Sequence, residues 1–247
     1  MENQENKKDN LDQLAIVQRD GQTFTIVPHI PGGITDVVTL RKICDVAEKY
    51  NAKALKMTSA QRIALVGITE DQVEPAWNDL GMGKGQAIGY AVRSVKICPG
   101  TTFCKRAKQD SVTLGLELDK RYHGMELPCK LKIGVSGCPN SCSENIIKDI
   151  GIMGNVNGFT VMIGGLGSGK GRLADVIYQG QTPEETLQIV DKIIKTYQEI
   201  SRKGVRLGML LKRIGPELFV RAMEAEGEER KKLVEEIKLK GDPTNSK

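Results

Sequence analysis

Four of the six cysteines stand in two close pairs whose spacing suits an inorganic cofactor. Cys98 and Cys104 form a C-x5-C motif, and Cys138 and Cys142 form a C-x3-C motif further along the chain. Cysteine sulfur is a soft ligand, and a cubic [4Fe–4S] cluster takes one thiolate for each iron. A proline follows the first cysteine of each pair, and glycines stand nearby, which favours turns that wrap around a bulky group. The two pairs therefore predict a [4Fe–4S] site.

Other roles for these thiols fit less well. Structural zinc sites usually draw their cysteine pairs from C-x2–4-C spacing, which the first motif exceeds. Disulfides are rare in the cytoplasm, and the polar first ten residues, MENQENKKDN, contain no secretory signal. Cys44 and Cys129 stand outside both motifs, and we expect them to be unpaired core cysteines.

The composition is that of an ordinary globular protein of one or two domains, with 247 residues and 39% hydrophobic content. Its net charge of +5 and aromatic content of 4% are too small to indicate a nucleic-acid surface. A mild positive field suits a small anion or an acidic protein partner better. No run of about eighteen apolar residues occurs, so we expect no membrane span and a cytoplasmic location.

A small β-α-β-α layer is predicted over residues 20–92. Residues 24–33 (FTIVPHIPGG) indicate a strand closed by a Pro-Gly-Gly turn, and Asp36 is placed to cap the helix that follows. Residues 54–68 are rich in strand formers, and residues 70–82 indicate a helix in spite of their proline. Strands and helices thus alternate in this part of the chain.

After this layer the chain becomes rich in cysteine, proline and glycine. Residues 131–137 and 149–165 indicate strands that lead into glycine-rich turns. Residues 182–185 (TPEE) form a capping box with proline at the first helical position, which predicts a helix over residues 183–201. The charged stretch from residue 207 onward predicts two further helices.

Four stretches in this order, IPGGIT, KMTSAQRIALVGI, CPGTTFC and GVSGCPNSCSE, resemble the siroheme-dependent sulfite and nitrite reductase family, and the resemblance covers most of residues 24–220. It implies an α+β fold with two domains. A ferredoxin-like α/β half-domain would span residues 21–92, and a siroheme- and [4Fe–4S]-binding α/β domain with a mixed sheet would span residues 93–205. Residues 1–20 would be a polar tail, and residues 206–247 a C-terminal helical segment and tail.

The resemblance assigns the cluster ligands residue by residue. Cys98, Cys104, Cys138 and Cys142 would hold the [4Fe–4S] cluster, and the thiolate of Cys142 would also bind the siroheme iron. A shared thiolate connects electrons stored in the cluster to a substrate bound on the opposite face of the heme. The implied activity is an enzymatic reduction of sulfite to sulfide or of nitrite to ammonia.

Siroheme carries many carboxylates, so its pocket requires cations and backbone donors. The glycine-rich, basic loop over residues 164–175 (GGLGSGKGRLAD) resembles such a pocket in the family. The siroheme-binding residues implied by the resemblance, besides Cys142, are Thr58, Gln61, Arg62, Asn140, Gly165, Gly167, Lys170 and Arg172. The same loop matches a G-x4-G-K phosphate loop, but Gly171 stands where a Ser or Thr would hold magnesium.

Three cations resemble the residues that the family places above the distal heme face. They are Arg93, before the first cysteine, and Lys130 and Lys132 in PCKLKIG. Alternation along a strand points both lysines to one side. Such cations would stabilise an oxyanion and donate protons as each oxygen leaves as water. The other interpretation of the lysines is a solvated strand face.

The chain departs from the family pattern at two places. The arginines that often precede the P-G-G turn are Val27 and His29 here. The family's T-x-R-Q is Thr58-Ser-Ala-Gln61, with Arg62 one place later. The choice between sulfite and nitrite therefore stays open.

The larger reductases of this family contain the module twice, whereas this chain carries one copy with both the cysteines and the lysines. We therefore expect an isologous homodimer, because closed twofold symmetry is the commonest assembly. The sequence has no flavin motif and no second cysteine cluster, so an external ferredoxin-like carrier is the expected electron donor.

Two other classes of function stay open at this point. One is a non-catalytic electron-transfer module that carries the cluster, with or without siroheme, within a larger complex. The other is a zinc-stapled or nucleotide-binding scaffold in which the cysteine spacing is coincidental.

Overall fold

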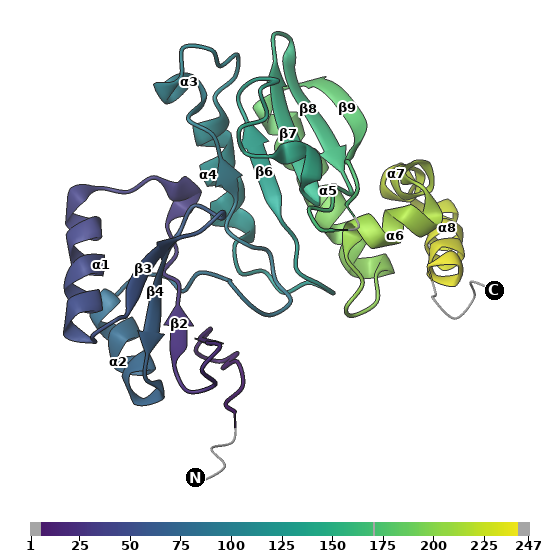
Figure 1. Cartoon of the computed structure of the whole chain (residues 1–247). Helices are drawn as coiled ribbons and strands as arrows, with labels where there is room; N and C mark the ends of the chain where they lie inside the picture. Colours follow the sequence, from purple (N-terminus) through teal and green to yellow (C-terminus); the bar gives the residue numbers. More distant parts are fainter. Residues whose placement is uncertain (1–5, 170, 242–247) are drawn as a thin grey trace. The chain divides into compact units, whose positions relative to one another are not determined.

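The computed structural model describes residues 6–169 and 171–241, which form two compact units (Figure 1). The first unit is Met1–Gly89 and the second is Tyr90–Lys247, and each is described by itself. Within the described ranges, no helix has both the length and the hydrophobicity that crossing a membrane requires.

The first unit contains a four-stranded antiparallel sheet in the order β1-β2-β4-β3. The strands are β1 (Ile16–Val17), β2 (Phe24–Ile26), β3 (Ala54–Met57) and β4 (Ile63–Ile68). The strand-rich stretch over residues 54–68 is thus a hairpin of two strands. Gln61 has a φ of 58°, and this left-handed residue turns the chain between them.

Two helices accompany this sheet, α1 (Val37–Lys49) and α2 (Glu70–Leu80), as the sequence predicts. The carboxylate of Asp36 accepts the Thr39 N–H at 2.7 Å and so caps α1. A 3-10 turn, η1 (Pro31–Gly33), precedes that cap. Phe24, Ile43 and Trp77, from β2 and the two helices, lie in the buried core of this unit.

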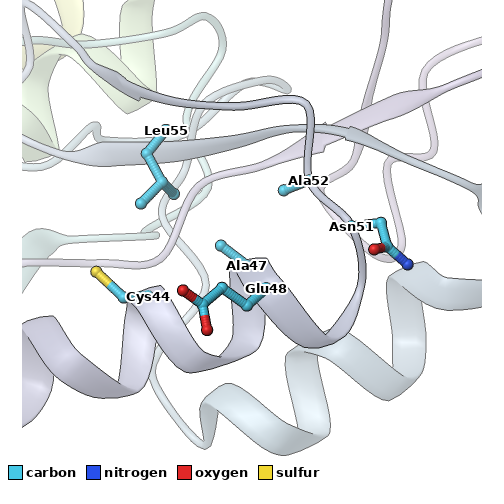
Figure 2. Close-up of a pocket in the computed structure, with 6 residues that line it drawn as sticks. All are labelled: Cys44, Ala47, Glu48, Asn51, Ala52 and Leu55. Carbon is cyan, nitrogen blue, oxygen red and sulfur yellow. The ribbon is translucent and has the colours of Figure 1, made fainter.

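Cys44 lies on the outer face of α1, so the prediction of a core position for this cysteine was wrong. The helix buries Ile43 and Ala47, and a step of one residue from Ile43 turns the side chain of Cys44 outward. It lines an open cavity of about 470 Å³ between α1 and β3 (Figure 2). The other lining residues are Ala47, Glu48, Asn51, Ala52 and Leu55, none of them a predicted site residue.

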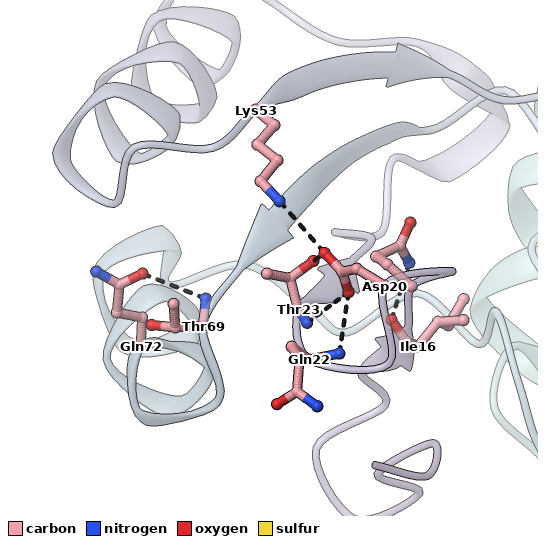
Figure 3. A network of polar contacts seen from close by, with 8 residues as sticks. Ile16, Asp20, Gln22, Thr23, Lys53, Thr69 and Gln72 are labelled. Atoms are coloured by element: carbon pink, nitrogen blue, oxygen red, sulfur yellow. Dashed lines mark hydrogen bonds and ion pairs between the residues drawn. The ribbon is translucent and has the colours of Figure 1, made fainter. Parts of the chain in front are cut away.

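The turn between β1 and β2 is organised by one carboxylate (Figure 3). Asp20 accepts the N–H groups of Thr23 and Gln22 at 2.9 and 3.0 Å. It also accepts the Thr23 hydroxyl at 2.7 Å and the Lys53 ammonium at 3.3 Å. These bonds, led by the Thr23 N–H, hold the pKa of Asp20 well below its usual range. The turn therefore keeps its charged carboxylate at ordinary pH.

The second unit contains a five-stranded sheet in the order β5-β6-β7-β8-β9. The strands are β5 (Lys96–Ile97), β6 (Ile133–Ser136), β7 (Ile150–Asn155), β8 (Gly158–Ile163) and β9 (Asp175–Gln181). The first three are parallel, and the last two join them antiparallel. The predicted mixed sheet is confirmed.

Helices cover one face of this sheet (Figure 1). The short helix α3 (Gly100–Phe103) leads to α4 (Ser111–Tyr122), and α5 (Pro183–Ile200) packs beside the antiparallel strands. The capping box of α5 forms as predicted: Thr182 accepts the Glu185 N–H at 3.2 Å and Glu185 accepts the Thr182 N–H at 2.8 Å.

Three helices, and not the predicted two, end the described chain: α6 (Leu207–Ile214), α7 (Pro216–Glu224) and α8 (Gly227–Lys240). Gly215 ends α6 with a φ of 82°, and proline at the next position starts α7. Their apolar sides share the core of α4 and α5.

The other face of the sheet is covered by the connection from β6 to β7, residues 137–149, which includes the 3-10 turn η2 (Asn145–Ile147). Two glycines opposite each other in the register, Gly134 and Gly151, allow this close approach. A Cβ on Gly151 would lie 2.2 Å from the Asn145 carbonyl oxygen, and one on Gly134 would lie 2.9 Å from the Lys148 side chain. The cysteine loop is thereby laid directly on the sheet.

Candidate functional site

The C-x5-C motif starts at the carboxyl end of β5. Cys98 is buried, and its N–H donates to the Val135 carbonyl at 3.0 Å, which extends the pairing of β5 with β6. Gly100 then turns the chain with a φ of 54°, and a Cβ there would lie 2.5 Å from the Ser111 hydroxyl. Cys104 follows α3 and is half-buried.

The C-x3-C motif meets the first motif at Gly137, the residue before Cys138. The Gly137 N–H donates to the Cys98 sulfur at 3.1 Å. Its carbonyl accepts the N–H groups of Lys108 and Gln109 at 2.7 and 3.1 Å. A Cβ on Gly137 would lie 3.1 Å from the Gly100 Cα. The two cysteine-bearing loops therefore meet at the carboxyl ends of β5 and β6.

The loop of the second motif carries one buried and one exposed thiol. Cys138 is buried, whereas Cys142 and Asn140 are exposed. Ser141, with a φ of 53°, and Glu144, with a φ of 57°, adopt left-handed conformations on either side of Cys142. The exposed thiol can thus face a second cofactor outside the loop.

The donor set fits a cluster of several irons. All of these cysteines are free thiols. Besides the Gly137 N–H, the Ser111 hydroxyl lies 3.2 Å from the Cys98 sulfur, and such polar contacts tune iron–sulfur centres. Within the described ranges, no three His, Cys, Asp or Glu side chains converge on the position of one metal ion. A cubic cluster, in contrast, spreads its four thiolates over four irons.

The three predicted catalytic cations lie in neighbouring backbone segments. Lys130 and Lys132 are exposed on either side of the buried Leu131, so they share one side of the chain as predicted. The Arg93 N–H donates to the Leu131 carbonyl at 2.9 Å. Arg93 itself is buried.

A buried ion pair lies at the start of β6. The Asp149 carboxylate, which is fully buried, accepts the Lys132 N–H at 2.9 Å and the Arg206 guanidinium at 2.5 Å. Burial raises the pKa of Asp149, and the Arg206 charge acts against that rise. Although the Lys132 side chain is exposed overall, partial desolvation of its ammonium, followed by the charges of Arg206, Lys148 and Lys130, lowers its pKa.

Sequence reasoning missed Asp149 and Arg206. Arg206 stands just before α6, far along the chain from Lys132, and nothing in its local pattern marks it. Cys129, also near this end, is buried as predicted.

The lysines and the cysteines lie at opposite ends of one strand. Lys132 precedes β6, whereas Gly137 and Cys138 follow it. The structure therefore places the two cysteine-bearing loops near the carboxyl end of β6 and the segments of the three cations near its amino end.

The glycine-rich loop lies on the connection that carries the cysteines. A Cβ on Gly165 would lie 2.3 Å from the Lys148 carbonyl oxygen, and one on Gly167 would lie 3.2 Å from the Ile147 side chain. Arg172 donates to the Gly164 carbonyl at 3.0 Å and pairs with Asp175. Lys170 lies outside the described residues. Strand β9 follows this loop, so the helix that a phosphate loop requires is missing there.

The predicted siroheme residues of the first unit form one turn. The Thr58 hydroxyl accepts the Arg62 N–H at 3.2 Å, and the Gln61 N–H donates to the Thr58 carbonyl at 3.1 Å. A Cβ on Gly33 would lie 2.6 Å from the Gln61 Cβ, so this turn packs against the Pro-Gly-Gly turn. Arg62 is buried.

Two family models match the chain. The model described as nitrite and sulphite reductase 4Fe-4S domain matches residues 88–231, and the nitrite/sulfite reductase ferredoxin-like half domain matches residues 16–83.

Curated relatives and a solved structure agree with these matches. The chain is 39% identical over 201 residues to "Nitrite reductase [NAD(P)H]" of Bacillus subtilis, covering 81% of this chain and 25% of that protein. It is 35% identical over 209 residues to "Sulfite reductase, assimilatory-type" of Nitratidesulfovibrio vulgaris, covering 85% of this chain and 96% of that protein. A crystal structure of dissimilatory sulfite reductase I superposes with a TM-score of 0.71 at 15% identity, over 83% of this chain and 69% of that one, which supports the fold. The chain thus spans a quarter of the first relative and nearly all of the second.

Proposed function

Because this chain belongs to the nitrite and sulfite reductase family, we propose that it reduces sulfite to sulfide or nitrite to ammonia. The family, the α+β fold and the pairing of siroheme with a [4Fe–4S] cluster agree with what the sequence predicts. The observation that carries the proposal is the meeting of both cysteine loops at Gly137, whose N–H donates to the Cys98 sulfur and whose Cα lies beside that of Gly100.

The four cysteines divide their roles by exposure. Cys98, Cys104 and Cys138, buried or half-buried, are proposed as cluster ligands only. Cys142, the exposed thiol, is proposed to serve both the cluster and the siroheme iron. When bound, these two groups store electrons and deliver them to the substrate.

The siroheme carboxylates are proposed to bind backbone and side-chain donors of this chain. Gly165 and Gly167 supply approachable N–H groups, because neither carries a Cβ where the loop is crowded. The remaining proposed residues are Thr58, Gln61, Arg62, Asn140, Lys170 and Arg172. Arg172 already bonds within its own loop, so its proposed part is to hold the glycines in place as much as to meet a carboxylate.

The oxyanion is proposed to bind Lys130, Lys132 and Arg93. Their positive charges stabilise an anion, and a lysine ammonium can donate the protons that each leaving oxygen needs. The lowered pKa of Lys132 makes its ammonium a stronger acid and supports this role.

We further propose that the protein is a homodimer with two equivalent active sites, each formed by residues of both copies. The cations lie at the amino end of β6 and the cysteines at its carboxyl end, so a twofold axis could place one copy's lysines opposite its partner's cysteines. Light scattering on the purified protein tests this. A dimer is expected, and a fully active monomer would contradict the proposal.

The electrons are proposed to come from a ferredoxin-like carrier in the cytoplasm. The net charge of +5 favours association with such an acidic protein. Turnover with a reduced ferredoxin should slow as salt is raised, because salt screens this attraction. A rate independent of both ferredoxin and salt would argue against this donor.

The central test is anaerobic purification followed by visible absorption, iron and sulfide analysis, and turnover of sulfite and nitrite with a chemical reductant. Siroheme bands above a broad iron–sulfur shoulder, with turnover of either anion, are expected. Both cofactors without turnover would make the chain an electron carrier. A colourless protein that holds zinc would overturn the assignment.

A further inference from the structure

Asn145, three residues after Cys142, is fully buried and forms hydrogen bonds through both the nitrogen and the oxygen of its side-chain amide. Its Nδ2 donates to the Ile152 carbonyl of β7 at 3.1 Å. Its Oδ1 accepts the hydroxyl of Ser141, and that of Ser136 at 3.2 Å. One side chain therefore connects the cysteine loop to two strands of the sheet.

The same set of bonds reaches both neighbours of Cys142. On one side, Ser141 donates to Asn145. On the other side, the Ser143 N–H donates to the Ser136 hydroxyl at 3.1 Å, and the Ser143 and Ser136 hydroxyls lie 2.6 Å apart. Cys142 is thus an exposed residue held between two anchored ones, although Ser141 takes a left-handed conformation that an unanchored serine rarely adopts.

The members of this set are uncharged. Ser136, Ser143 and Asn145 are each at most 1% exposed, and none of them adds a negative charge beside the thiolates. A buried carboxylate in the same place would repel a nearby cysteine thiolate and so make it less favourable for that cysteine to ionise and bind iron. The amide supplies both a donor and an acceptor without that penalty.

We propose that Asn145 is a positioning residue that fixes the thiol of Cys142, with Ser136 and Ser141 as its intermediaries. The inference rests on the proposed use of Cys142 as the thiolate shared by cluster and siroheme. Groups that orient metal ligands typically change metal affinity about 10–100-fold when they are removed.

The test compares Asn145→Ala and Ser141→Ala with the wild-type holoenzyme purified without oxygen. The readouts are iron and sulfide per chain, the rate of cluster loss to a chelator, and the magnetic coupling between cluster and siroheme seen by electron paramagnetic resonance. Asn155→Ala is the matched control, because it removes another side-chain amide bond of β7, to Thr160 at 2.8 Å, and none of the bonds to Ser136 or Ser141.

We expect Asn145→Ala to lose its cluster about 10–100-fold faster than the wild type and to show weaker coupling, with Asn155→Ala unchanged. Ser141→Ala should also speed cluster loss and weaken the coupling, but by less, because it removes only the hydrogen bond from Ser141 to Asn145. Circular dichroism of the apoproteins checks folding; if Asn145→Ala does not fold, Ser141→Ala decides, since its side chain is only partly buried.

Wild-type rates of cluster loss and wild-type coupling in both variants would overturn the inference. These readouts need no sulfite or nitrite, so a wild type that binds both cofactors without turnover would end the proposed reduction and leave this inference standing. A wild type without any four-iron cluster would end both.

Discussion

At its carboxyl end, β6 leads into a cysteine loop held by uncharged hydroxyl and amide groups, whereas at its amino end it begins at a lysine held by a buried ion pair. Ser136 and Asn145 form the first set, and Asp149 and Arg206 form the second. The two ends are separated by a strand of four residues, so one short element supports two different electrostatic environments.

The difference agrees with the charge that each end is proposed to hold. Thiolates are negative, and uncharged donors orient them without repulsion. A site for an anion requires several positive charges close together. Burying the Arg206 guanidinium near Lys132 costs less free energy because it pairs with the Asp149 carboxylate, which also accepts the backbone N–H of Lys132. The two networks are therefore not interchangeable, and a substitution at one end of β6 should change different properties from a substitution at the other.

The largest effect is expected from Cys138→Ala. The variant removes a buried thiol where the two cysteine loops meet, so the four-iron cluster should be lost, together with essentially all turnover. Iron and sulfide analysis measures the loss. Cys44→Ala, on the outer face of α1, is the matched control and should keep full iron. A Cys138→Ala protein with wild-type iron content and activity would contradict the assignment of the ligands.

A smaller effect, on the stability of the whole unit, is expected from Arg206→Met at the amino end of β6. It leaves Asp149 buried and unpaired, which should lower the free energy of unfolding by about 3–5 kcal/mol. Replacing both partners, in Asp149→Leu with Arg206→Met, should lower it by less. Urea denaturation measures both.

Arg121→Met is the control for this ion-pair prediction. Arg121 pairs with Glu117 on the exposed side of α4, and surface pairs of this kind contribute little. An equal loss of stability in Arg121→Met and Arg206→Met would mean that burial of the Asp149 pair is not what matters.

At the cysteine end, Gly137→Ala should have an intermediate effect. The new Cβ would lie 2.6 Å from the Gln109 carbonyl oxygen and 3.1 Å from the Gly100 Cα, so the two cysteine loops must move apart. Overpacking of this kind costs about 1–3 kcal/mol, and cluster retention should fall with it. Thermal unfolding and iron content measure the two effects. Gly83→Ala, whose Cβ would make an ordinary contact at 3.7 Å, should change neither the unfolding temperature nor the iron content. Equal losses in Gly83→Ala and Gly137→Ala would contradict the claim that crowding at Gly137 matters.

Local sequence patterns correctly predicted features that depend on residues close together in the chain, such as helix ends and the spacing of the cysteines. The capping box at Thr182 predicted α5 to within one residue of its observed end, and the cysteine spacing indicated the cluster. The break between α6 and α7 was also readable in the sequence, as Gly215 followed by proline, although the predicted count of helices missed it.

Contacts between distant segments were beyond that kind of reasoning. Asn145 gains its role from Ser136 and Ile152, which lie on two different strands. Arg206 reaches Asp149 only once α6 has packed against the sheet unit, so its function depends on the tertiary fold. An isolated asparagine or arginine in a sequence carries no signal of such a partner.

The smallest expected effect is a shift in the titration of Lys132. Partial desolvation of its ammonium and the neighbouring cations lower its pKa from the ordinary value of 10.5. Between the lowered pKa and 10.5, the unfolded chain binds a proton at Lys132 that the native chain has lost, so the free energy of unfolding should rise with pH across that window. Lys132→Met should abolish this rise.

Activity gives a second reading of the same titration, because only the protonated lysine can donate a proton. Turnover should therefore decline as pH rises through the lowered pKa of Lys132. Lys148→Met removes one of the charges that lower this pKa, so it should move both the nuclear magnetic resonance titration of the Lys132 amine and the decline in turnover to higher pH. Lys231→Met, at an exposed pair with Glu228 on α8, should move neither. If Lys132 titrates at 10.5 in the wild type, the ion pair at the amino end of β6 serves stability alone, and the contrast between the two ends is structural and not catalytic.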